Sequence, residues 1–269
     1  MQQFEKDYAK LIEKILKEGE VRKTRNGETT SIFGNMLTVP MNGDMTFPIL
    51  QGRKMYTKGV FGELAAILRG PKYIEDFERF GCNYWKMWAK EDGSIDVDYG
   101  NAWHADDQIE KLKTALKYNN TDRRMIISGW RPDRLDDLDL PCCHLLYQFY
   151  VRDGKYLDMM WYQRSVDTMI GLPSDIIFAA TWLIAIANEF DYLPGEIKMS
   201  LGDCHVYAEH YNKANEYLYG VKQMAELSVM PPTYKWNTPV GTDFCTFIPM
   251  DITIKKYISR AKMDLELKV

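Results

Sequence analysis

Apolar side chains in the first part of the chain mostly follow helical spacing. They recur every three or four positions over residues 4–16, which predicts an amphipathic helix with Gly19 at its C-cap. The same spacing over residues 106–117 predicts a second amphipathic helix. Between them, residues 30–39 are rich in strand-forming types and predict a strand.

Two segments are apolar around nearly their whole circumference, which predicts helices buried in the protein interior. Residues 60–69 contain a single acidic side chain, Glu63, and the predicted helix ends at Gly70. Residues 176–190 follow Pro173 and form the longer of the two predicted helices.

The middle of the chain changes to strand patterns. Residues 125–130 and 145–151 are short apolar runs, and an Asp-Gly turn at residues 152–155 leads into a returning strand over residues 156–164. Residues 196–201 predict a further strand. Strands mixed with buried helices in this way predict an α/β fold.

The last part of the chain predicts a helix over residues 206–218 and an extended tail over residues 244–254. No repeat, low-complexity stretch or linker divides the sequence. We therefore expect one domain over residues 1–269, with a helical lobe at about residues 71–117.

The charge balance argues against a nucleic-acid polymer as a partner. The chain has 34 Lys and Arg against 38 Asp and Glu, so its net charge of -4 gives no overall positive field. A bound phosphate must then be held by a few placed side chains. Candidates are Arg25, the pair Arg123 and Arg124, and Arg164 with Ser165, although each cluster alone also fits a solvated surface.

Composition and cysteine usage predict an intracellular protein. The polar first residues show no secretory signal, and the longest near-apolar run, residues 176–187, is too short to span a bilayer. Five cysteines without a CxxC pair fit neither a disulfide framework nor a zinc site. We therefore expect a cytoplasmic protein without a bound metal or a membrane contact.

One cysteine lies in a position suited to a nucleophile. Cys143 precedes His144 at the start of a predicted strand, and a thiolate there could attack an electrophilic carbon. Taken alone, the pair also fits a buried structural thiol.

Together these segments resemble the thymidylate synthase family. The resemblance covers roughly residues 4–217 and rests on many motifs in the family's order. Along the chain they are Arg25, Ser31-Ile32-Phe33-Gly34, Glu63-Leu64, Trp85, Trp88, Tyr99-Gly100, Arg123-Arg124, Cys143-His144, Gln148-Phe149-Tyr150, Tyr162-Gln163-Arg164-Ser165 with Asp167, Gly171-Leu172-Pro173, and Gly202-Asp203 with His205 and Tyr207.

The resemblance implies a fold and a chemistry. The fold is a twisted mixed β-sheet covered by helices, with the sheets of two subunits packed back to back in a homodimer. The chemistry is the transfer of a one-carbon unit from 5,10-methylenetetrahydrofolate to carbon 5 of a pyrimidine nucleotide. Cys143 is then the nucleophile that adds to ring carbon 6, while Cys142 replaces a family proline and is structural. Glu63 is the general acid and base acting through ordered water, since burial raises its pKa towards neutrality.

The same resemblance implies which residues bind the two substrates. Those expected to hold the 5′-phosphate are Arg25, Arg164 and Ser165, with Arg123 and Arg124 arriving from the partner subunit. Those expected to hold the sugar are His205 and Tyr207. Those expected to face the folate are Trp85, Trp88, Leu140, Asp167 and Gly171.

One departure from the family pattern concerns the base. Members that use deoxyuridylate carry asparagine where this chain has Asp175. An asparagine amide can donate to the uracil carbonyl and accept from the ring N–H, whereas an ionised aspartate cannot donate. Facing cytosine, Asp175 accepts from the exocyclic amine and shares a proton with the ring nitrogen, which helps Cys143 attack. Polar groups left unpaired against the wrong base can discriminate by several orders of magnitude.

This substitution resembles the phage-type deoxycytidylate (dCMP) hydroxymethylases, in which water rather than a hydride adds to the exocyclic methylene intermediate. Ser174, where synthases have phenylalanine, and the charged last residues 264–269 agree with the entry of water. A different explanation is that Asp175 merely caps the helix after Pro173. A virus-encoded enzyme acting in the host cytoplasm and a nucleoside pathway are both compatible settings.

Three other functions stay open. A thymidylate synthase that methylates dUMP would need Asp175 in its protonated form. A hydroxymethylase could instead use CMP, because tolerance of the 2′-hydroxyl is not readable from the residues. A catalytically silent nucleotide- or RNA-binding relative is disfavoured, because the candidate nucleophile and its expected partners are all present and the net charge is -4.

Overall fold

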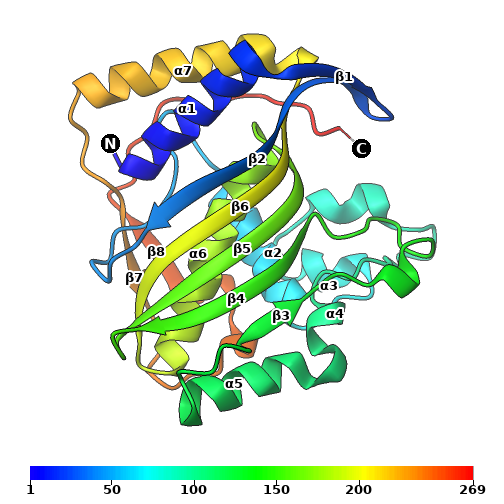
Figure 1. Ribbon diagram of the computed structural model, residues 1–269, viewed down its shortest axis with the longest axis vertical. Helices are drawn as coiled ribbons and strands as arrows, with labels where there is room; N and C mark the ends of the chain where they lie inside the picture. The colour runs from blue at the N-terminus through cyan, green and yellow to red at the C-terminus, as the bar shows by residue number, and fades with distance from the viewer. Residues whose placement is uncertain (269) are drawn as a thin grey trace.

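A six-stranded mixed sheet runs through the middle of the molecule in the computed structural model, which describes residues 1–268 (Figure 1). The strand order is β1-β2-β6-β5-β4-β3, and only β5 and β6 pair in parallel. The strands are β1 (Glu20–Thr24), β2 (Gly27–Pro40), β3 (Ile126–Ser128), β4 (His144–Arg152), β5 (Tyr156–Asp167) and β6 (Leu193–Tyr207). The predicted α/β class, with a mixed sheet covered by helices, is confirmed.

Helix α6 (Gly171–Glu189) connects the two parallel strands and lies behind the sheet, where α2 (Thr57–Ile67) packs against it (Figure 1). By length and composition α6 could cross a membrane, but 78% of its most apolar stretch is buried inside the protein. This burial is what a central core helix requires, and it explains why apolar residues surround the helix on nearly all sides.

The remaining elements cover the ends of the sheet. Helices α1 (Gln3–Glu18) and α7 (Tyr211–Glu226) lie side by side, with the rings of Tyr8 and Tyr217 in edge contact at 5.4 Å (Figure 1). The other helices and strands are α3 (Ile74–Glu78), η1 (Tyr84–Trp88), α4 (Asn101–His104), η2 (Ala105–Asp107), α5 (Gln108–Tyr118), η3 (Pro132–Arg134), η4 (Ala208–His210), β7 (Thr233–Trp236), η5 (Phe244–Thr246), η6 (Pro249–Asp251) and β8 (Ile252–Lys255).

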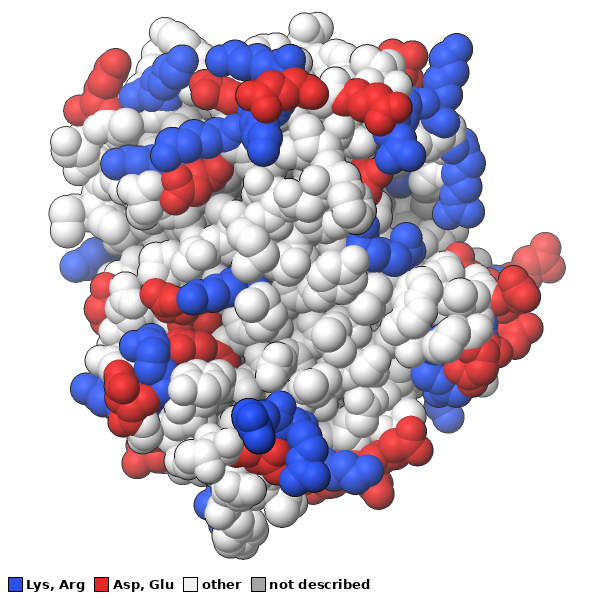
Figure 2. Space-filling view, in the orientation of Figure 1, with Lys and Arg blue, Asp and Glu red and all other residues white. Residues whose placement is uncertain are grey.

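The sheet face turned towards the viewer in Figure 1 carries no helix. The strand register brings Met36, Ser200, Tyr162 and Leu146 into one row across β2, β6, β5 and β4. Met36 is 54% and Leu146 38% exposed, and Figure 2 shows an uncharged area in the middle of this face with charged residues around it. We call this the open sheet face.

Two predicted elements differ from the structure, and one strand was not predicted. The helix predicted over residues 206–218 begins only at Tyr211, because β6 continues to Tyr207. The extended tail over residues 244–254 contains two short 3-10 turns, and only its end from Ile252 is a strand. Strand β1 was not predicted, because its five residues are all exposed and mostly polar.

Gly19 ends the first helix as predicted, but for a different reason. Its φ of -71° is available to any residue, so no left-handed C-cap is present. A Cβ atom at this position would lie 2.4 Å from the carbonyl oxygen of Ile15 and 2.5 Å from Cγ2 of Thr30, so the close approach of β2 requires glycine.

The single-domain organisation stays a prediction. Nearly all of the buried hydrophobic side chains belong to one cluster that extends from Phe4 to Ile252. The predicted lobe at residues 71–117 holds α3, η1, α4 and most of α5, and its aromatic residues Phe77, Trp85 and Trp103 belong to the same cluster.

Candidate active site

Cys143 lies immediately before β4, partly exposed, at the end of the sheet where β5 stops. The Tyr99 hydroxyl accepts a hydrogen bond of 2.6 Å from the backbone N–H of Cys143. Burial raises the pKa of the Cys143 thiol, and the positive charge of Arg164 opposes that rise. The site therefore holds a protonated thiol beside a group that stabilises its thiolate.

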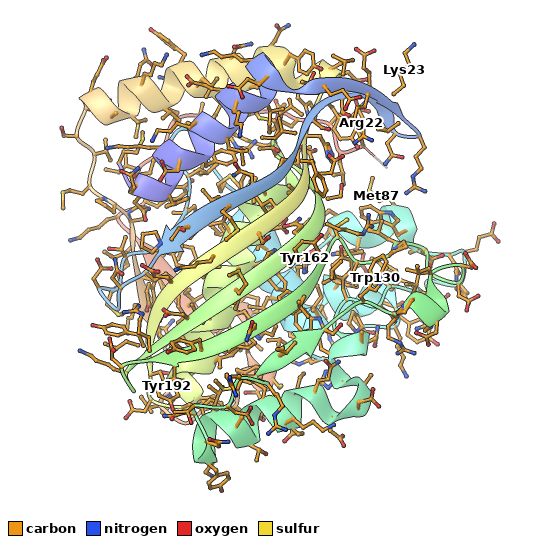
Figure 3. All side chains as sticks on the ribbon, in the orientation of Figure 1. Arg22, Lys23, Met87, Trp130, Tyr162 and Tyr192 are labelled. Atoms are coloured by element: carbon orange, nitrogen blue, oxygen red, sulfur yellow. The ribbon has the colours of Figure 1, made fainter. Side chains whose placement is uncertain are left out.

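Arg164 on β5 supports the cysteine segment through several bonds. Its Nε donates to the carbonyl of Cys142 over 2.9 Å and its Nη2 to the carbonyl of Pro141 over 3.0 Å. The same Nη2 lies 3.8 Å from Cys143 Sγ. Figure 3 shows Trp130 beside the sheet, where its ring lies 5.7 Å from the Arg164 guanidinium. Arg164 thus holds the cysteine segment in place and supplies a positive charge beside Cys143.

Cys142 has the surroundings of a structural thiol. Its side chain is buried, and desolvation raises its pKa far above the ordinary value. A thiol that resists ionisation is a poor nucleophile, so this geometry favours Cys143 of the two neighbours.

Glu63 in α2 presents a carboxylate that is held on both sides. The Tyr84 hydroxyl donates to Oε2 over 2.7 Å, and the indole N–H of Trp85 donates to Oε1 over 2.8 Å. Burial raises the pKa of Glu63 to about 7, although both donated bonds act against the rise. An acid with this pKa can give and take a proton at neutral pH.

Asp175 is the fifth residue of α6 and lies within electrostatic reach of Glu63 and Cys143. Its Oδ2 accepts a 2.7 Å hydrogen bond from Gln163 Nε2. Burial, together with the charges of Glu63 and Asp167, raises the pKa of Asp175 to about 7, and the charge of Asp175 in turn raises the pKa of Cys143. The alternative that Asp175 caps the helix is wrong, because α6 begins at Gly171 and its N-cap is Ile170.

Three of the residues expected at the phosphate and sugar lie within electrostatic reach of Cys143, namely Arg25, Arg164 and Tyr207. Burial raises the pKa of both Cys143 and Tyr207, and the charge of Arg25, in the exposed turn between β1 and β2, opposes that rise. Ser165 pairs with Asp203 across β5 and β6, and Asp203 lies 2.9 Å from His205 Nδ1. If His205 donates there, its Nε2 is left free to accept from a substrate.

The residues expected at the folate differ in their exposure and contacts. The ring of Trp85 is buried and stacks on Phe77 at 5.1 Å, and its indole N–H holds Glu63. Trp88, Leu140 and Gly171 are partly exposed. Asp167 Oδ1 accepts from the N–H groups of Met169 and Ile170, while its buried Oδ2 has no partner among residues 1–268.

That unpaired oxygen is suited to a folate ring. A buried carboxylate oxygen without a hydrogen bond is costly, so a donor supplied by a ligand would restore its pairing. Within residues 1–268, no group of three or more His, Cys, Asp or Glu side chains is arranged to hold a metal ion.

Arg123 and Arg124 are not joined to this cluster within the described chain. Both are exposed in the segment before β3, where Arg124 pairs with Asp122 at 3.2 Å. The side-chain amide of Gln148, an exposed residue of β4, donates to the Arg123 carbonyl over 3.4 Å. The two arginines therefore lie at the rim of the sheet rather than beside Cys143.

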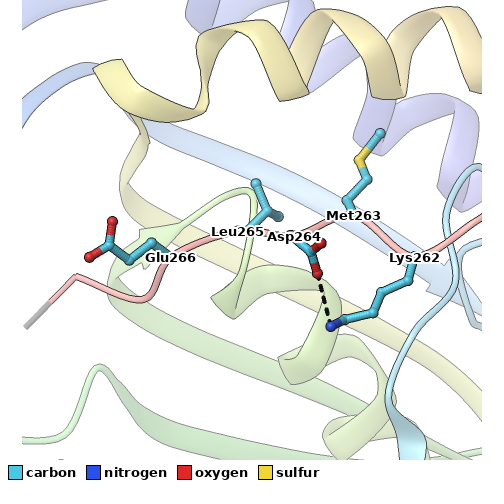
Figure 4. A pocket seen from close by; sticks show the side chains of 5 residues that line it. All are labelled: Lys262, Met263, Asp264, Leu265 and Glu266. Atoms are coloured by element: carbon cyan, nitrogen blue, oxygen red, sulfur yellow. Dashed lines mark ion pairs between the residues drawn. The ribbon is translucent and has the colours of Figure 1, made fainter.

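The C-terminal segment is tied to the turn that follows β6. His210 Nε2 lies 3.1 Å from the Glu266 carbonyl oxygen, and Lys268 pairs with Glu209. Residues 262–266 line a shallow hollow, in which Lys262 and Asp264 form an exposed pair at 2.9 Å (Figure 4).

Sequence reasoning gave no role to several residues that hold the candidate acids and the nucleophile. Tyr99, Tyr84, Gln163 and Trp161 each belong to the network described above, and two of them were visible only as members of family motifs. Their roles depend on contacts between distant segments, such as Tyr84 with Glu63, and no local pattern signals those contacts.

Comparison with known families agrees with this arrangement. The family model described as thymidylate synthase matches residues 6–269, nearly the whole chain. Members of this family use a folate, methylenetetrahydrofolate, to transfer a one-carbon unit to a pyrimidine nucleoside monophosphate. With a candidate cysteine nucleophile, a half-buried glutamate of raised pKa and a mixed sheet in place, the chain belongs to the thymidylate synthase family.

Proposed function

We propose that this protein is a deoxycytidylate hydroxymethylase, which converts dCMP to 5-hydroxymethyl-dCMP with 5,10-methylenetetrahydrofolate and water. The observation that carries the proposal is the ionisable side chain of Asp175, held beside Gln163 and within electrostatic reach of Glu63 and Cys143. A carboxyl group at this point reads the edge of the pyrimidine, and its chemistry fits cytosine.

Base recognition follows from donors and acceptors. Cytosine presents an amine that donates and a ring nitrogen that accepts or, when protonated, donates. Ionised Asp175 offers two acceptors and so matches the amine and the protonated ring nitrogen. Uracil presents a carbonyl oxygen instead of the amine, and that oxygen would face a carboxylate without a proton between them.

The catalytic steps fall to two side chains. Cys143 adds to ring carbon 6 as a thiolate, which Arg164 stabilises by its charge. Glu63, with its pKa raised to about 7, accepts and returns protons through ordered water. The folate supplies the one-carbon unit, and water adds to the methylene group that it leaves on carbon 5.

Arg25, Arg164 and Ser165 would hold the phosphate of the nucleotide, and His205 and Tyr207 the sugar. The folate would lie against Trp88, Leu140, Gly171 and the outer side of Trp85, with the unpaired Oδ2 of Asp167 accepting a hydrogen bond from it. These roles follow the family motifs, and the charges of Arg25 and Arg164 near Cys143 support them.

The working unit that we propose is a homodimer. The open sheet face exposes apolar side chains across β2, β6, β5 and β4, and an uncharged surface of this kind is typical of a protein interface. A second copy of the chain would cover it. Arg123 and Arg124 at the rim of that face are then placed to reach the partner's nucleotide site.

The nearest alternative is methylation of dUMP. A pKa of about 7 leaves a fraction of Asp175 protonated at neutral pH, and a protonated carboxyl can donate to the uracil carbonyl. A third possibility is hydroxymethylation of CMP, which differs only in the 2′-hydroxyl.

A competition experiment tests the proposal. The protein is incubated with methylenetetrahydrofolate and equal amounts of dCMP, CMP and dUMP, and products are identified by mass while dihydrofolate is followed by absorbance. We expect 5-hydroxymethyl-dCMP and no dihydrofolate, and no product with Cys143→Ala. Formation of dTMP with dihydrofolate would contradict the proposal, and activity in the Cys143→Ala protein would make Cys142 the candidate nucleophile.

A further inference from the structure

Asp175 is held by a hydrogen-bond relay that begins at a tryptophan. The indole N–H of Trp161 donates to Gln163 Oε1 over 3.1 Å, and Gln163 Nε2 donates to Asp175 Oδ2 over 2.7 Å. Trp161 and Gln163 are two residues apart in β5, so they share one face of the strand, and both are buried.

The direction of the relay follows from its first member. An indole N–H donates and cannot accept, so the Gln163 atom that faces it must be the amide oxygen. The amide nitrogen therefore faces Asp175 and donates. A carboxylate or carbonyl oxygen accepts such a bond better than an acid hydroxyl does, so Oδ2 stays without a proton. A proton on the free carboxyl is then carried by Oδ1, which has no partner among residues 1–268.

We propose that Trp161 and Gln163 are positioning residues that place a proton on ring nitrogen 3 of bound cytosine. The inference rests on the proposed function, in which Asp175 reads the base. With Oδ2 opposite nitrogen 3, Asp175 accepts there and cannot donate. When dCMP binds, Oδ1 gives up its proton to water and nitrogen 3 takes one up from water, which converts a neutral acid and a neutral ring into a carboxylate and a protonated ring. Oδ1 then accepts from the exocyclic amine.

The choice of Oδ2 as the atom opposite nitrogen 3 follows from comparing aspartate with asparagine. In an Asp175→Asn protein, the relay holds the amide oxygen beside Gln163 and leaves the amide nitrogen free to donate. Uracil presents a donor at nitrogen 3 and an acceptor at carbon 4. The amide can pair with uracil only if its oxygen, beside Gln163, faces nitrogen 3 and its nitrogen faces the oxygen on carbon 4. The same orientation towards the base therefore suits both the aspartate and the asparagine side chain.

Among the groups around Asp175, Gln163 is the one that favours the ionised form of this side chain. Burial raises the pKa of Asp175, and the bond from Gln163 lowers it. The titratable side chains that influence or face Asp175 are Glu63 of α2, Asp167 at the end of β5, Cys143 before β4 and Tyr147 in β4. None of these is a cation, so none can replace the relay.

The most direct test observes nitrogen 3 itself. We would bind dCMP labelled with nitrogen-15 at this position to Cys143→Ala protein, in which no adduct forms, and record its NMR signal. The signal of a protonated ring is expected with the relay intact, and that of a neutral ring when Gln163→Met or Trp161→Phe is added. A neutral signal with the relay intact, or a protonated one in all three proteins, overturns the inference.

Kinetics supply a second readout. A neutral Asp175 can still pair with neutral cytosine, so Gln163→Met should lower kcat for dCMP about tenfold or more while KM changes less than about threefold. The pH at which activity is half-maximal should also rise, because the pKa of Asp175 loses the influence that lowers it. An equal loss in kcat from Gln163→Met at every pH, or a change confined to KM, would contradict a positioning role.

Trp182→Phe is the matched control. Trp182 is a fully buried tryptophan in the same core, stacked on Trp103 at 4.3 Å, and its indole N–H has no partner among residues 1–268. It should lose thermal stability as Trp161→Phe does, with kcat and the nitrogen-15 signal unchanged. If the wild-type protein converts dUMP rather than dCMP, the proposed function fails, while the signal of bound dCMP still decides whether the relay places the proton.

Discussion

Glu63 and Asp175 hold the protons that the proposed chemistry needs. Burial raises the pKa of each to about 7, and the charge of Glu63 contributes to the shift of Asp175. Two acids that disfavour each other's ionisation titrate as a pair, so at neutral pH the site keeps a proton available. Each is nevertheless held differently, Glu63 by Tyr84 and Trp85 and Asp175 by Gln163.

Asp175→Asn should exchange the base that the site accepts. The amide oxygen still accepts from Gln163, and the amide nitrogen can donate to the carbonyl of uracil. We expect the ratio of kcat/KM for dCMP to kcat/KM for dUMP to fall by about a hundredfold or more. The ratio is measured with each nucleotide alone, and an unchanged ratio would mean that Asp175 does not read the base.

The same substitution has a predictable effect on stability. An acid with a raised pKa binds its proton more tightly in the folded than in the unfolded protein, so its ionisation opposes folding. That cost grows as pH rises from about 4 to about 7 and is constant above. Asp175→Asn should therefore be more stable than wild type at pH 8, by on the order of 1–3 kcal/mol, with no difference from this source below pH 4. Urea unfolding at several pH values measures this, and a pH-independent difference would contradict the buried-acid account.

The segment between β3 and β4 shows how an element positions the nucleophile without touching substrate. Arg134 in η3 donates to Asp96 and, over 2.8 Å, to the fully buried Asp98. Asp98 precedes Tyr99, whose hydroxyl accepts from the backbone of Cys143. One arginine thus ties the loop that carries Leu140 and Cys142 to the chain that supports the nucleophile.

Arg134→Met should destabilise the protein by about 2 kcal/mol, because it leaves the buried Asp98 without its cationic partner. We also expect a lower kcat, since Tyr99 loses part of its support. The control is Arg131→Met, which removes an exposed pair with Asp133 and should leave the unfolding midpoint almost unchanged. Equal effects from both substitutions would show that Asp98 does not depend on Arg134.

Elements with strong periodic patterns were predictable from the sequence, and those set by tertiary contacts were not. The apolar residues of α6 and the Asp-Gly turn between β4 and β5 carry their own signals. The start of α7 does not, because Val206 and Tyr207 satisfy helical spacing as well as they satisfy β6. At the site, Glu63 and Asp175 could be identified as unusual, whereas their partners Tyr84 and Gln163 become meaningful only after folding.

In the whole molecule, one face of the sheet packs against the helices of the core and the other carries no helix. Helices α6 and α1 pack against the strands and α2 packs against α6, while Met36 and Leu146 lie exposed on the open sheet face (Figures 1 and 2). If a second copy covers that face, each nucleotide site is completed by Arg123 and Arg124 of its neighbour.

Mixing two inactive proteins tests this completion. Cys143→Ala lacks the nucleophile, and an Arg123→Ala, Arg124→Ala double variant should bind nucleotide phosphate poorly. In a mixed dimer, one site combines an intact Cys143 with intact arginines from the other chain. We expect activity to reappear on mixing under conditions that allow subunit exchange, to at most about a quarter of wild type for random pairing. If mixed dimers are shown to form and no activity returns, Arg123 and Arg124 do not act on the partner's site.

The source of the added oxygen distinguishes a hydroxymethylase from a thymidylate synthase. The protein is given dCMP and methylenetetrahydrofolate in water enriched in heavy oxygen, and the nucleotide product is weighed. We expect 5-hydroxymethyl-dCMP that carries the heavy oxygen on its new carbon, with tetrahydrofolate released and no dihydrofolate. A methylated pyrimidine nucleotide formed together with dihydrofolate would contradict this expectation.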